Sequence, residues 1–312
     1  MSARLGLGST QFGLDYGVSN RRGQCSPAEV KRILALAGAA GVRIVDTAAD
    51  YGNAEATLGE VLAPNHEFRI VTKVGWADDV GAAAGAPEEL EAALAESLGR
   101  LKQESVHAVL FRRPDNLHGT HRAAVRRWAA SVKARGLAAK IGVSLHTPED
   151  ADTLLAGLEV DIVQTPFNIL DRRIISRGRL ERLKDAGIEV HARSVFLQGL
   201  LLMAPGDIPA ELAAARPPVA AVHEAARQAG LSPLEAALGF VLGQEGIDCA
   251  LVGAASADQA REIFRAARGA GKTTIPAVTG LDDADILNPV RWPQHLIHHS
   301  HAGAALVETQ RL

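Results

Sequence analysis

Eight short apolar runs recur along this 312-residue chain, separated by longer stretches rich in alanine, leucine, glutamate and arginine. Runs such as RIVDT and RIVTK are apolar at most positions and end in a polar residue, as strands buried on both faces of a parallel sheet do. The expected strands are Arg4–Gly8, Arg43–Thr47, Arg69–Lys73, His107–Arg112, Lys140–Ser144, Ile162–Thr165, Glu189–Ser194 and Ala250–Gly253.

The intervening stretches have the period of amphipathic helices. Ser26 and Pro27 are typical of a helix start, and Gly41 predicts its end after Ala40. Further helices are expected at Pro87–Leu101, Thr120–Arg135, Pro148–Leu158, Ser176–Ala186, Ala214–Ala229, Pro233–Gln244 and Ala257–Ala267. This alternation continues without a linker, so we expect residues 1–312 to form one domain, a (β/α)8 or TIM barrel, with a doubly wound open sheet as the alternative. The tail after about residue 290 has no recognisable motif.

The composition argues against several classes of partner. The net charge of −3 and the aromatic content of 4% provide neither a basic field nor stacking platforms for nucleic acid. Cys25 and Cys249 lie far apart, which fits a reducing compartment. The start of the chain does not resemble a signal peptide, and no apolar stretch reaches the ~20 residues that span a bilayer, so we expect a cytoplasmic protein without membrane contact. The sequence does not indicate an oligomeric state.

Three side chains near the ends of the second and third runs form the main catalytic hypothesis. In a parallel barrel, reactive groups gather at the carboxyl ends of strands, which are Asp46 and Lys73 here, with Tyr51 in the loop after Asp46. A buried lysine needs an anionic partner, and Asp46 can supply it. A cation beside a phenol stabilises the phenolate, so Tyr51 could give a proton to a carbonyl oxygen. The alternative is a structural ion pair beside a packed tyrosine ring.

One glycine pattern and one histidine pattern in the sequence do not indicate further binding sites. The glycines at 6, 8, 13 and 17 do not match the dinucleotide fingerprint of a Rossmann fold, because no helix is expected directly after the first strand. They are predicted to mark turns and close backbone approaches at the rim of the barrel. The histidines at 298, 299 and 301 have no evident supporting partners, so we predict no metal site.

Several segments, taken in order, resemble the aldo-keto reductases. RIVDTAADYGNAEATLGEVL followed by IVTKVG is similar to the opening of that family, and LGLGSTQFG, KIGVSLHTPED, IVQTPFN, ARSVFLQGLLL and LVGAASADQAREI are similar to its other segments. The resemblance covers residues 4 to 265. It implies a (β/α)8 barrel that binds a nicotinamide cofactor at the carboxyl mouth, usually NADP(H), with NAD(H) as the alternative, and reduces a small carbonyl or sugar substrate.

By position, the resemblance also implies roles for individual residues. Tyr51 would be the proton donor, with Lys73 and Asp46 tuning it. The residues implied to bind the cofactor are Ser144 and Gln164 at the carboxamide, Ser194, Phe196, Gln198 and Gly199 along the pyrophosphate, and Gly253, Ser256, Gln259 and Glu262 at the adenosine end. Trp76 and His146 are the expected substrate-pocket residues.

The chain departs from the family pattern at several positions. Arg112 stands where the family has a histidine, and an arginine keeps its proton, so it can polarise a carbonyl or bind an anion but cannot shuttle a proton. It could instead pair with Asp46, Asp50 or Asp115. Two alternatives therefore stay open: a cofactor-binding sensor or partner subunit with lost or altered catalysis, and a non-redox barrel enzyme.

Two further segments lead to weaker expectations. The adenosine segment lacks the usual basic residues for a 2′-phosphate and has Ile263 where the family has asparagine, so the NADP(H) preference rests on the resemblance alone. The arginine-rich stretch Arg172–Arg182 is partly balanced by neighbouring carboxylates, and we predict that it is a solvated helix face.

Overall fold

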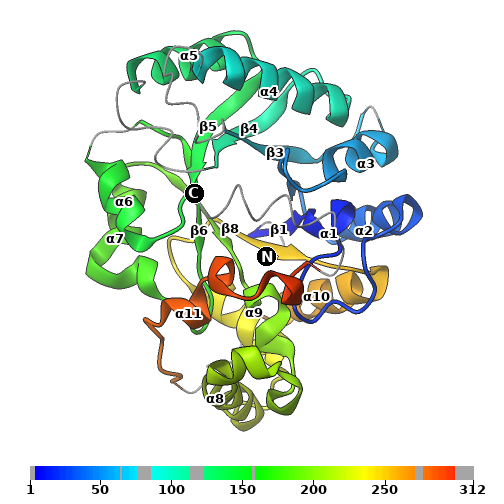
Figure 1. Cartoon of the computed structure of the whole chain (residues 1–312), viewed down its shortest axis with the longest axis vertical. Coiled ribbons are helices and arrows are strands. Elements are labelled where there is room, and N and C mark those ends of the chain that lie inside the picture. Colours follow the sequence, from blue (N-terminus) through cyan, green and yellow to red (C-terminus); the bar gives the residue numbers. More distant parts are fainter. Residues whose placement is uncertain are drawn as a thin grey trace.

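Eight parallel strands close into a barrel in chain order, so the predicted fold is confirmed and the open sheet is excluded. The computed structural model describes residues 4–63, 65–75, 86–112, 122–156, 159–270 and 277–298. The strands are β1 (Leu5–Gly8), β2 (Ile44–Asp46), β3 (Arg69–Val74), β4 (Val106–Phe111), β5 (Ala138–Ser144), β6 (Ile162–Pro166), β7 (Glu189–Arg193) and β8 (Cys249–Gly253). Figure 1 shows the strands at the centre with the helices around them.

The helices that were expected from the sequence are present, with ends that differ by a few residues. They are α2 (Pro27–Ala39), α4 (Ala86–Leu101), α5 (Arg122–Ala134), α6 (Pro148–Leu155), α7 (Arg179–Asp185), α8 (Arg216–Gln228), α9 (Pro233–Gly243) and α10 (Ala257–Gly269). Ser26 caps α2 as predicted, because its side chain accepts a hydrogen bond from the Glu29 amide.

Three short helices were not foreseen: α1 (Thr10–Gly13), α3 (Ala54–Val61) and α11 (Ala284–Leu287). The prediction that no helix follows the first strand was wrong, since α1 begins two residues after β1 ends. It is only one turn long, and its N-terminus has no side-chain cap that a sequence could reveal. None of the helices in the described ranges is both long and apolar enough to cross a bilayer.

The prediction that Arg172–Arg182 is a solvated helix face holds for Arg177 and Arg182, which are exposed, but is wrong for Arg179. Arg179 is only 2% exposed and pairs with Glu149 and Asp152 of α6. The Arg172 guanidinium lies 4.5 Å from the centre of the Phe240 ring. Carboxylates that are distant in sequence neutralise this stretch, so its arginines can be buried or packed on neighbouring elements.

The inside of the barrel is filled in layers. Ile44, Val71 and Leu110 belong to one buried apolar cluster within the strands. Residues two positions apart on a strand point to the same side, so Asp46 and Lys73 follow Ile44 and Val71 on the inward face. The apolar layer therefore closes the barrel below, and the polar layer faces the carboxyl mouth, where active sites of such barrels lie.

Two glycines hold the loop after β2 directly against α1. A Cβ on Gly13 would lie 1.7 Å from the carbonyl oxygen of Tyr51, and a Cβ on Gly52, which has φ of +56°, would lie 2.3 Å from the carbonyl oxygen of Gly13. The predicted close backbone approach at the rim is thus confirmed at Gly13. This contact fixes the backbone that carries Tyr51.

We expect Gly13→Ala to destabilise the protein, because the added methyl group meets backbone atoms that have no room to move. The expected loss in the free energy of unfolding is roughly 1–3 kcal/mol or more. Gly99→Ala is the matched control: an added Cβ there meets nothing within 4 Å, and the residue lies in α4. That substitution should stabilise by about 0.5–1 kcal/mol. Urea unfolding of both variants measures the difference, and equal stabilities would contradict the account.

Candidate active site

The centre of the site is a buried ion pair between β2 and β3. Lys73 Nζ donates to Asp46 Oδ1 at 2.8 Å and to Oδ2 at 2.7 Å, and also to the carbonyl oxygen of Thr47 at 3.0 Å. Both residues are 5% exposed. Burial lowers the pKa of the Lys73 ammonium, but the charge of Asp46 and its hydrogen bonds outweigh this, so the pKa lies above its ordinary value.

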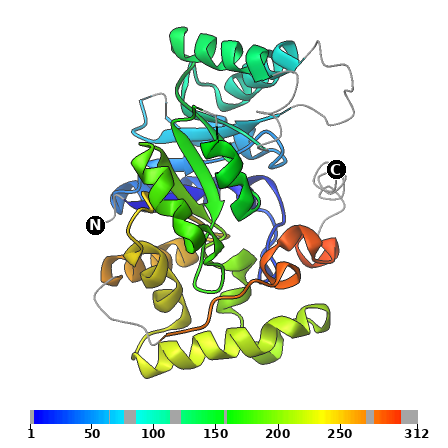
Figure 2. The ribbon, with the colours of Figure 1, turned by 90° about the vertical axis from the view of Figure 1, so that its left-hand side faces the viewer.

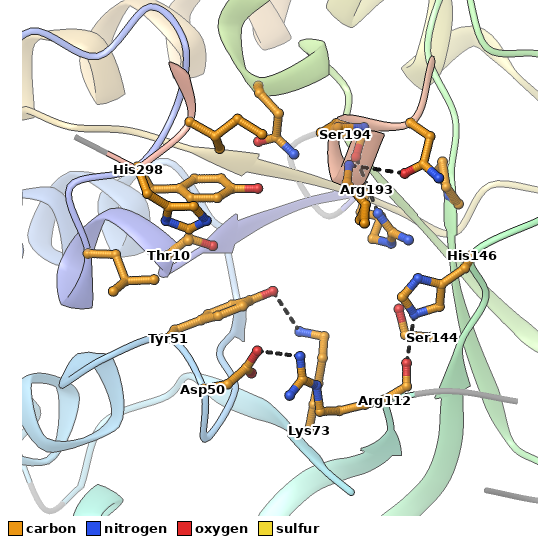
Figure 3. Close-up of a pocket in the computed structure, with 18 of the residues that line it drawn as sticks. Thr10, Asp50, Tyr51, Lys73, Arg112, Ser144, His146, Arg193, Ser194 and His298 are labelled. Atoms are coloured by element: carbon orange, nitrogen blue, oxygen red, sulfur yellow. Dashed lines mark hydrogen bonds and ion pairs between the residues drawn. The ribbon is translucent and has the colours of Figure 1, made fainter. Parts of the chain in front are cut away.

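Tyr51 joins this pair from the loop after β2. Its hydroxyl oxygen accepts a hydrogen bond from Lys73 Nζ at 3.5 Å, and the ammonium lies 5.0 Å from the ring centre. Backbone hydrogen bonds attach the loop to β3: the Thr47 amide donates to the carbonyl oxygen of Val71, and the Ala49 amide donates to the carbonyl oxygen of Lys73. The structure thus brings the predicted residues Asp46, Tyr51 and Lys73 together. Figure 3 shows the Tyr51 hydroxyl beside the Lys73 ammonium.

Arg112 follows β4 and is fixed in position by several contacts. Its guanidinium forms an ion pair with Asp50 at 2.6 Å, with side-chain exposures of 24% and 15%. Its amide donates to Val74 at 3.0 Å, and its carbonyl oxygen accepts from His146 Nε2 at 2.8 Å. Of the partners considered from the sequence, the observed one is Asp50, while Asp115 lies outside the described residues.

A pocket opens at the carboxyl mouth, and we call it the mouth pocket. Tyr51, Lys73 and Arg112 line one side, Ser144 and His146 lie next to Arg112, and Arg193 lies across from Tyr51 (Figure 3). Its other lining residues are Thr10, Leu14, Tyr16, Asp50, Pro166, Arg173, Ser194, Gln198, Leu287, Asn288, Pro289, Val290, Gln294, Ile297 and His298.

The C-terminal segment, which has no recognisable motif, forms one wall of the mouth pocket. It comprises α11 and the short 3-10 helices η8 (Pro289–Arg291) and η9 (Gln294–Leu296), drawn in orange and red beside the barrel in Figure 2. The Gly17 amide donates to the carbonyl oxygen of Ile297 at 2.9 Å, and the Tyr16 and His298 rings are 5.1 Å apart. The two ends of the chain therefore enclose the pocket together. Residues 299–312 lie outside the described part.

A second cavity, which we call the groove, adjoins the mouth pocket. Both are lined by Thr10, Tyr16, Tyr51, Arg193, Ser194 and Gln198. From there the groove runs along the loop after β7 to the start of α10. The residues predicted to bind the cofactor that line it are Ser194, Phe196, Gln198, Gly199, Gly253, Gln259 and Glu262.

The remaining predicted residues lie elsewhere. Ser144 lines the mouth pocket. Gln164 is fully buried: its Nε2 donates to Asp46, and its Oε1 has no hydrogen-bond partner among the described residues. Ser256 is 2% exposed and caps α10 by accepting from the Gln259 amide at 3.2 Å. Neither Gln164 nor Ser256 lines the two cavities. Trp76 lies outside the described residues.

The groove has features that suit a nicotinamide dinucleotide. Behind Asp46, which lines the groove, the buried Gln164 Oε1 is an acceptor without a partner among the described residues, as a carboxamide donor requires. The loop after β7 has left-handed backbone at Ser194, Leu197, Gln198 and Gly199, which is rare for residues other than glycine and typical of ligand sites. The groove ends at the N-terminus of α10, where an anion is favoured. The residues present therefore fit this cofactor. No group of three or more possible metal ligands occurs within the described ranges.

Sequence reasoning missed Arg193, Arg173 and Tyr16. Arg193 ends the buried strand β7 and lines both cavities. A charged residue at the end of an apolar strand is the same signal that identified Lys73, so Arg193 was detectable. Arg173 begins the 3-10 helix η4 (Arg173–Gly178) and Tyr16 lies in the loop after α1, and neither position carries such a signal.

The chain belongs to the aldo-keto reductases: the model of the aldo/keto reductase family matches residues 4–273. An aldo-keto reductase from Mycobacterium sp. (strain MCS) is 34% identical over 139 residues, 43% of this chain and 46% of that protein, so the match spans about half the length of such relatives. L-glyceraldehyde 3-phosphate reductase from Escherichia coli (strain K12) is 27% identical over 290 residues, covering 81% of this chain and 83% of that protein.

Solved structures agree with the fold. An aldo-keto reductase from Bacillus halodurans in its holo form matches with a TM-score of 0.67 and 19% identity, over 95% of this chain and 93% of that one. A putative aldo-keto reductase from Pseudomonas aeruginosa matches with a TM-score of 0.63 and 24% identity, over 86% of this chain and 90% of that one. At these identities the likeness supports the fold alone.

We expect Asp46→Asn to destabilise the protein strongly, because it leaves the Lys73 ammonium buried without its charged partner. The expected loss in the free energy of unfolding at neutral pH is about 3–5 kcal/mol. Since the folded pKa of Lys73 lies above 10.5, the contribution of the pair is intact below that pH and is lost as the pH rises through the folded value. The difference from the wild type should therefore shrink in the alkaline range.

Urea unfolding at several pH values measures this effect. Glu224→Gln, which breaks an ion pair with Arg227 on the surface of α8, is the matched control and should change the unfolding midpoint little. An equal effect of both substitutions would show that Asp46 does not hold a buried charge.

Proposed function

We propose that this protein is an NAD(P)H-dependent oxidoreductase that reduces the carbonyl group of an aldehyde, ketone or sugar, with Tyr51 as the proton donor. One observation carries the proposal: the Tyr51 hydroxyl lies 3.5 Å from the Lys73 ammonium, at the junction of the mouth pocket and the groove. The membership of the aldo-keto reductases supports it.

The proposed chemistry assigns one step to each of three side chains. The Tyr51 hydroxyl donates its proton to the carbonyl oxygen, and the ammonium of Lys73 stabilises the phenolate that remains. Asp46 keeps Lys73 charged, since the pKa of that ammonium is raised. A bound nicotinamide cofactor supplies the hydride to the carbonyl carbon. Gln164 and Ser144 would hold its carboxamide, and Ser194 to Gly199 and Gly253 to Glu262 would hold the rest.

Arg112 is proposed to act as a fixed positive charge on the wall of the mouth pocket. Its ion pair with Asp50 sets the position of the guanidinium, and its charge polarises a carbonyl group or attracts an anionic substrate. Since arginine side chains do not shuttle protons, the proposal assigns proton transfer to Tyr51 alone. The substrate pocket in this proposal also includes His146 and Trp76.

The cofactor is proposed to be NADP(H), as is usual in the family, with NAD(H) as the alternative. The start of α10 favours an anion, but the Glu29 carboxylate already accepts a hydrogen bond from the Ala257 amide there at 2.6 Å. Arg261, a candidate partner for a 2′-phosphate, pairs with Asp258. Titration with NADPH and NADH, followed by cofactor fluorescence, distinguishes the two.

Tyr51→Phe should lower kcat by about 10²–10⁴-fold and leave cofactor binding intact, because it removes only the proton donor. The matched control is Tyr16→Phe, since Tyr16 is the other tyrosine of the chain and lines the same cavities. It should retain turnover to within a few fold. Steady-state reduction of a panel of aldehydes, with cofactor oxidation followed by absorbance, measures both variants. Undiminished turnover by Tyr51→Phe would exclude Tyr51 as the donor.

Arg112→Gln should lower kcat by about tenfold or more without weakening cofactor binding, because a charge beside the reacting carbonyl is lost. Arg112→Lys, which keeps the charge, should retain more of the rate. If both variants turn over like the wild type, Arg112 serves only to hold Asp50. Cofactor binding without turnover across the panel, with turnover gained in Arg112→His, would instead establish a sensor or partner subunit.

A further inference from the structure

Arg193 lies at the end of β7 with its guanidinium between the two cavities. One terminal nitrogen donates to the carbonyl oxygen of Leu145 at 2.9 Å, and the other donates weakly to Ser194 Oγ at 3.4 Å. The third nitrogen, Nε, is buried and has no hydrogen-bond partner in the part of the chain that the structure describes. Part of the hydrogen-bonding capacity of this group is therefore unused.

Arg193 also lacks an ion-pair partner in the described part of the chain. The other lysine and arginine side chains of the mouth pocket each have a carboxylate partner. Lys73 pairs with Asp46, Arg112 with Asp50, and Arg173 with Asp171. Arg193 has no carboxylate within ion-pairing distance among residues 4–63, 65–75, 86–112, 122–156, 159–270 and 277–298. Burial lowers the pKa of its guanidinium, which reflects the cost of a desolvated charge.

We propose that Arg193 binds an anionic group of the substrate, so that the preferred substrates are aldehydes or ketones that carry a carboxylate or a phosphate. This inference rests on the proposed carbonyl reduction. The planar guanidinium matches carboxylate and phosphate oxygens geometrically, and an arriving anion supplies both the missing charge and an acceptor for the unused donors.

The position of the guanidinium favours the substrate over the cofactor as the source of the anion. Its bond to Leu145 directs it toward the end of β5, beside the proposed substrate-pocket residue His146, which lines the mouth pocket but not the groove. Figure 3 shows Arg193 across the cavity from Tyr51. An anionic group held there leaves the other end of a short substrate free to reach the Tyr51 hydroxyl.

Matched pairs of probes test the proposal. Succinic semialdehyde is compared with butanal for the carboxylate, and glyceraldehyde 3-phosphate with glyceraldehyde for the phosphate. The wild type should have a kcat/KM at least about tenfold higher for one or both charged members, and the pair that shows the preference identifies the anion. Arg193→Gln should lower kcat/KM for that charged probe by about 10–100-fold and leave the neutral probe within about threefold. Arg227→Gln on the exposed surface of α8 should change neither.

Other outcomes would overturn it. An equal loss with charged and neutral probes, or a raised KM for the cofactor, would assign Arg193 to the cofactor instead. A wild type without preference for charge would also refute it. Arg193→Lys, which keeps a positive charge, should restore part of the preference, and matching unfolding midpoints show that the variants are folded.

The proposal can fail separately from the proposed function. If no carbonyl probe is reduced at all, calorimetric titration of the wild type with succinate and with inorganic phosphate still reads out the anion site. Binding that disappears in Arg193→Gln supports the site, and absence of binding in the wild type refutes it. Turnover of neutral probes with no effect at Arg193 would uphold carbonyl reduction and refute the anion site.

Discussion

The buried pair of Lys73 and Asp46 is the interaction on which the rest of the site depends. It joins two adjacent strands where their carboxyl ends reach the mouth, above an apolar layer that seals the barrel. An ammonium at this depth stays charged only because the carboxylate faces it. The Lys73 ammonium in turn donates a hydrogen bond to the Tyr51 hydroxyl. The contact of the loop after β2 with Gly13 matters because it holds Tyr51 beside this pair.

The strands could be predicted because burial on both faces leaves a nearly continuous apolar run, and the long helices because of their amphipathic period and caps such as Ser26. The short helix α1 could not. Its single turn is stabilised by tertiary contact with the loop after β2, through Gly13, rather than by its own propensity. For the same reason the burial of Arg179 was missed, since the carboxylates that neutralise it lie on α6.

Residues of the candidate site could be predicted from the sequence where they lie at or next to the carboxyl end of a strand. Asp46, Lys73 and Arg112 all follow this rule, and Arg193 follows it too. The walls of the mouth pocket follow no such rule. Tyr16 meets His298 only because the ends of the chain converge, and a contact between residues so far apart leaves no local pattern. The left-handed backbone at Leu197 and Gln198 was equally hidden, because neither residue is a glycine.

The charges of the mouth pocket bear on what can occupy it. At the position where the family has a titratable histidine, this chain has Arg112, whose charge is paired with Asp50. A second arginine, Arg193, lines the same pocket and has no ion-pair partner in the described part of the chain. A neutral substrate would leave that second charge desolvated and uncompensated on binding, whereas an anionic one would complete the balance. In the proposed function, Tyr51 is the group that exchanges the proton. The two proposals together assign charge selection to Arg193 and proton transfer to Tyr51, on opposite sides of one pocket.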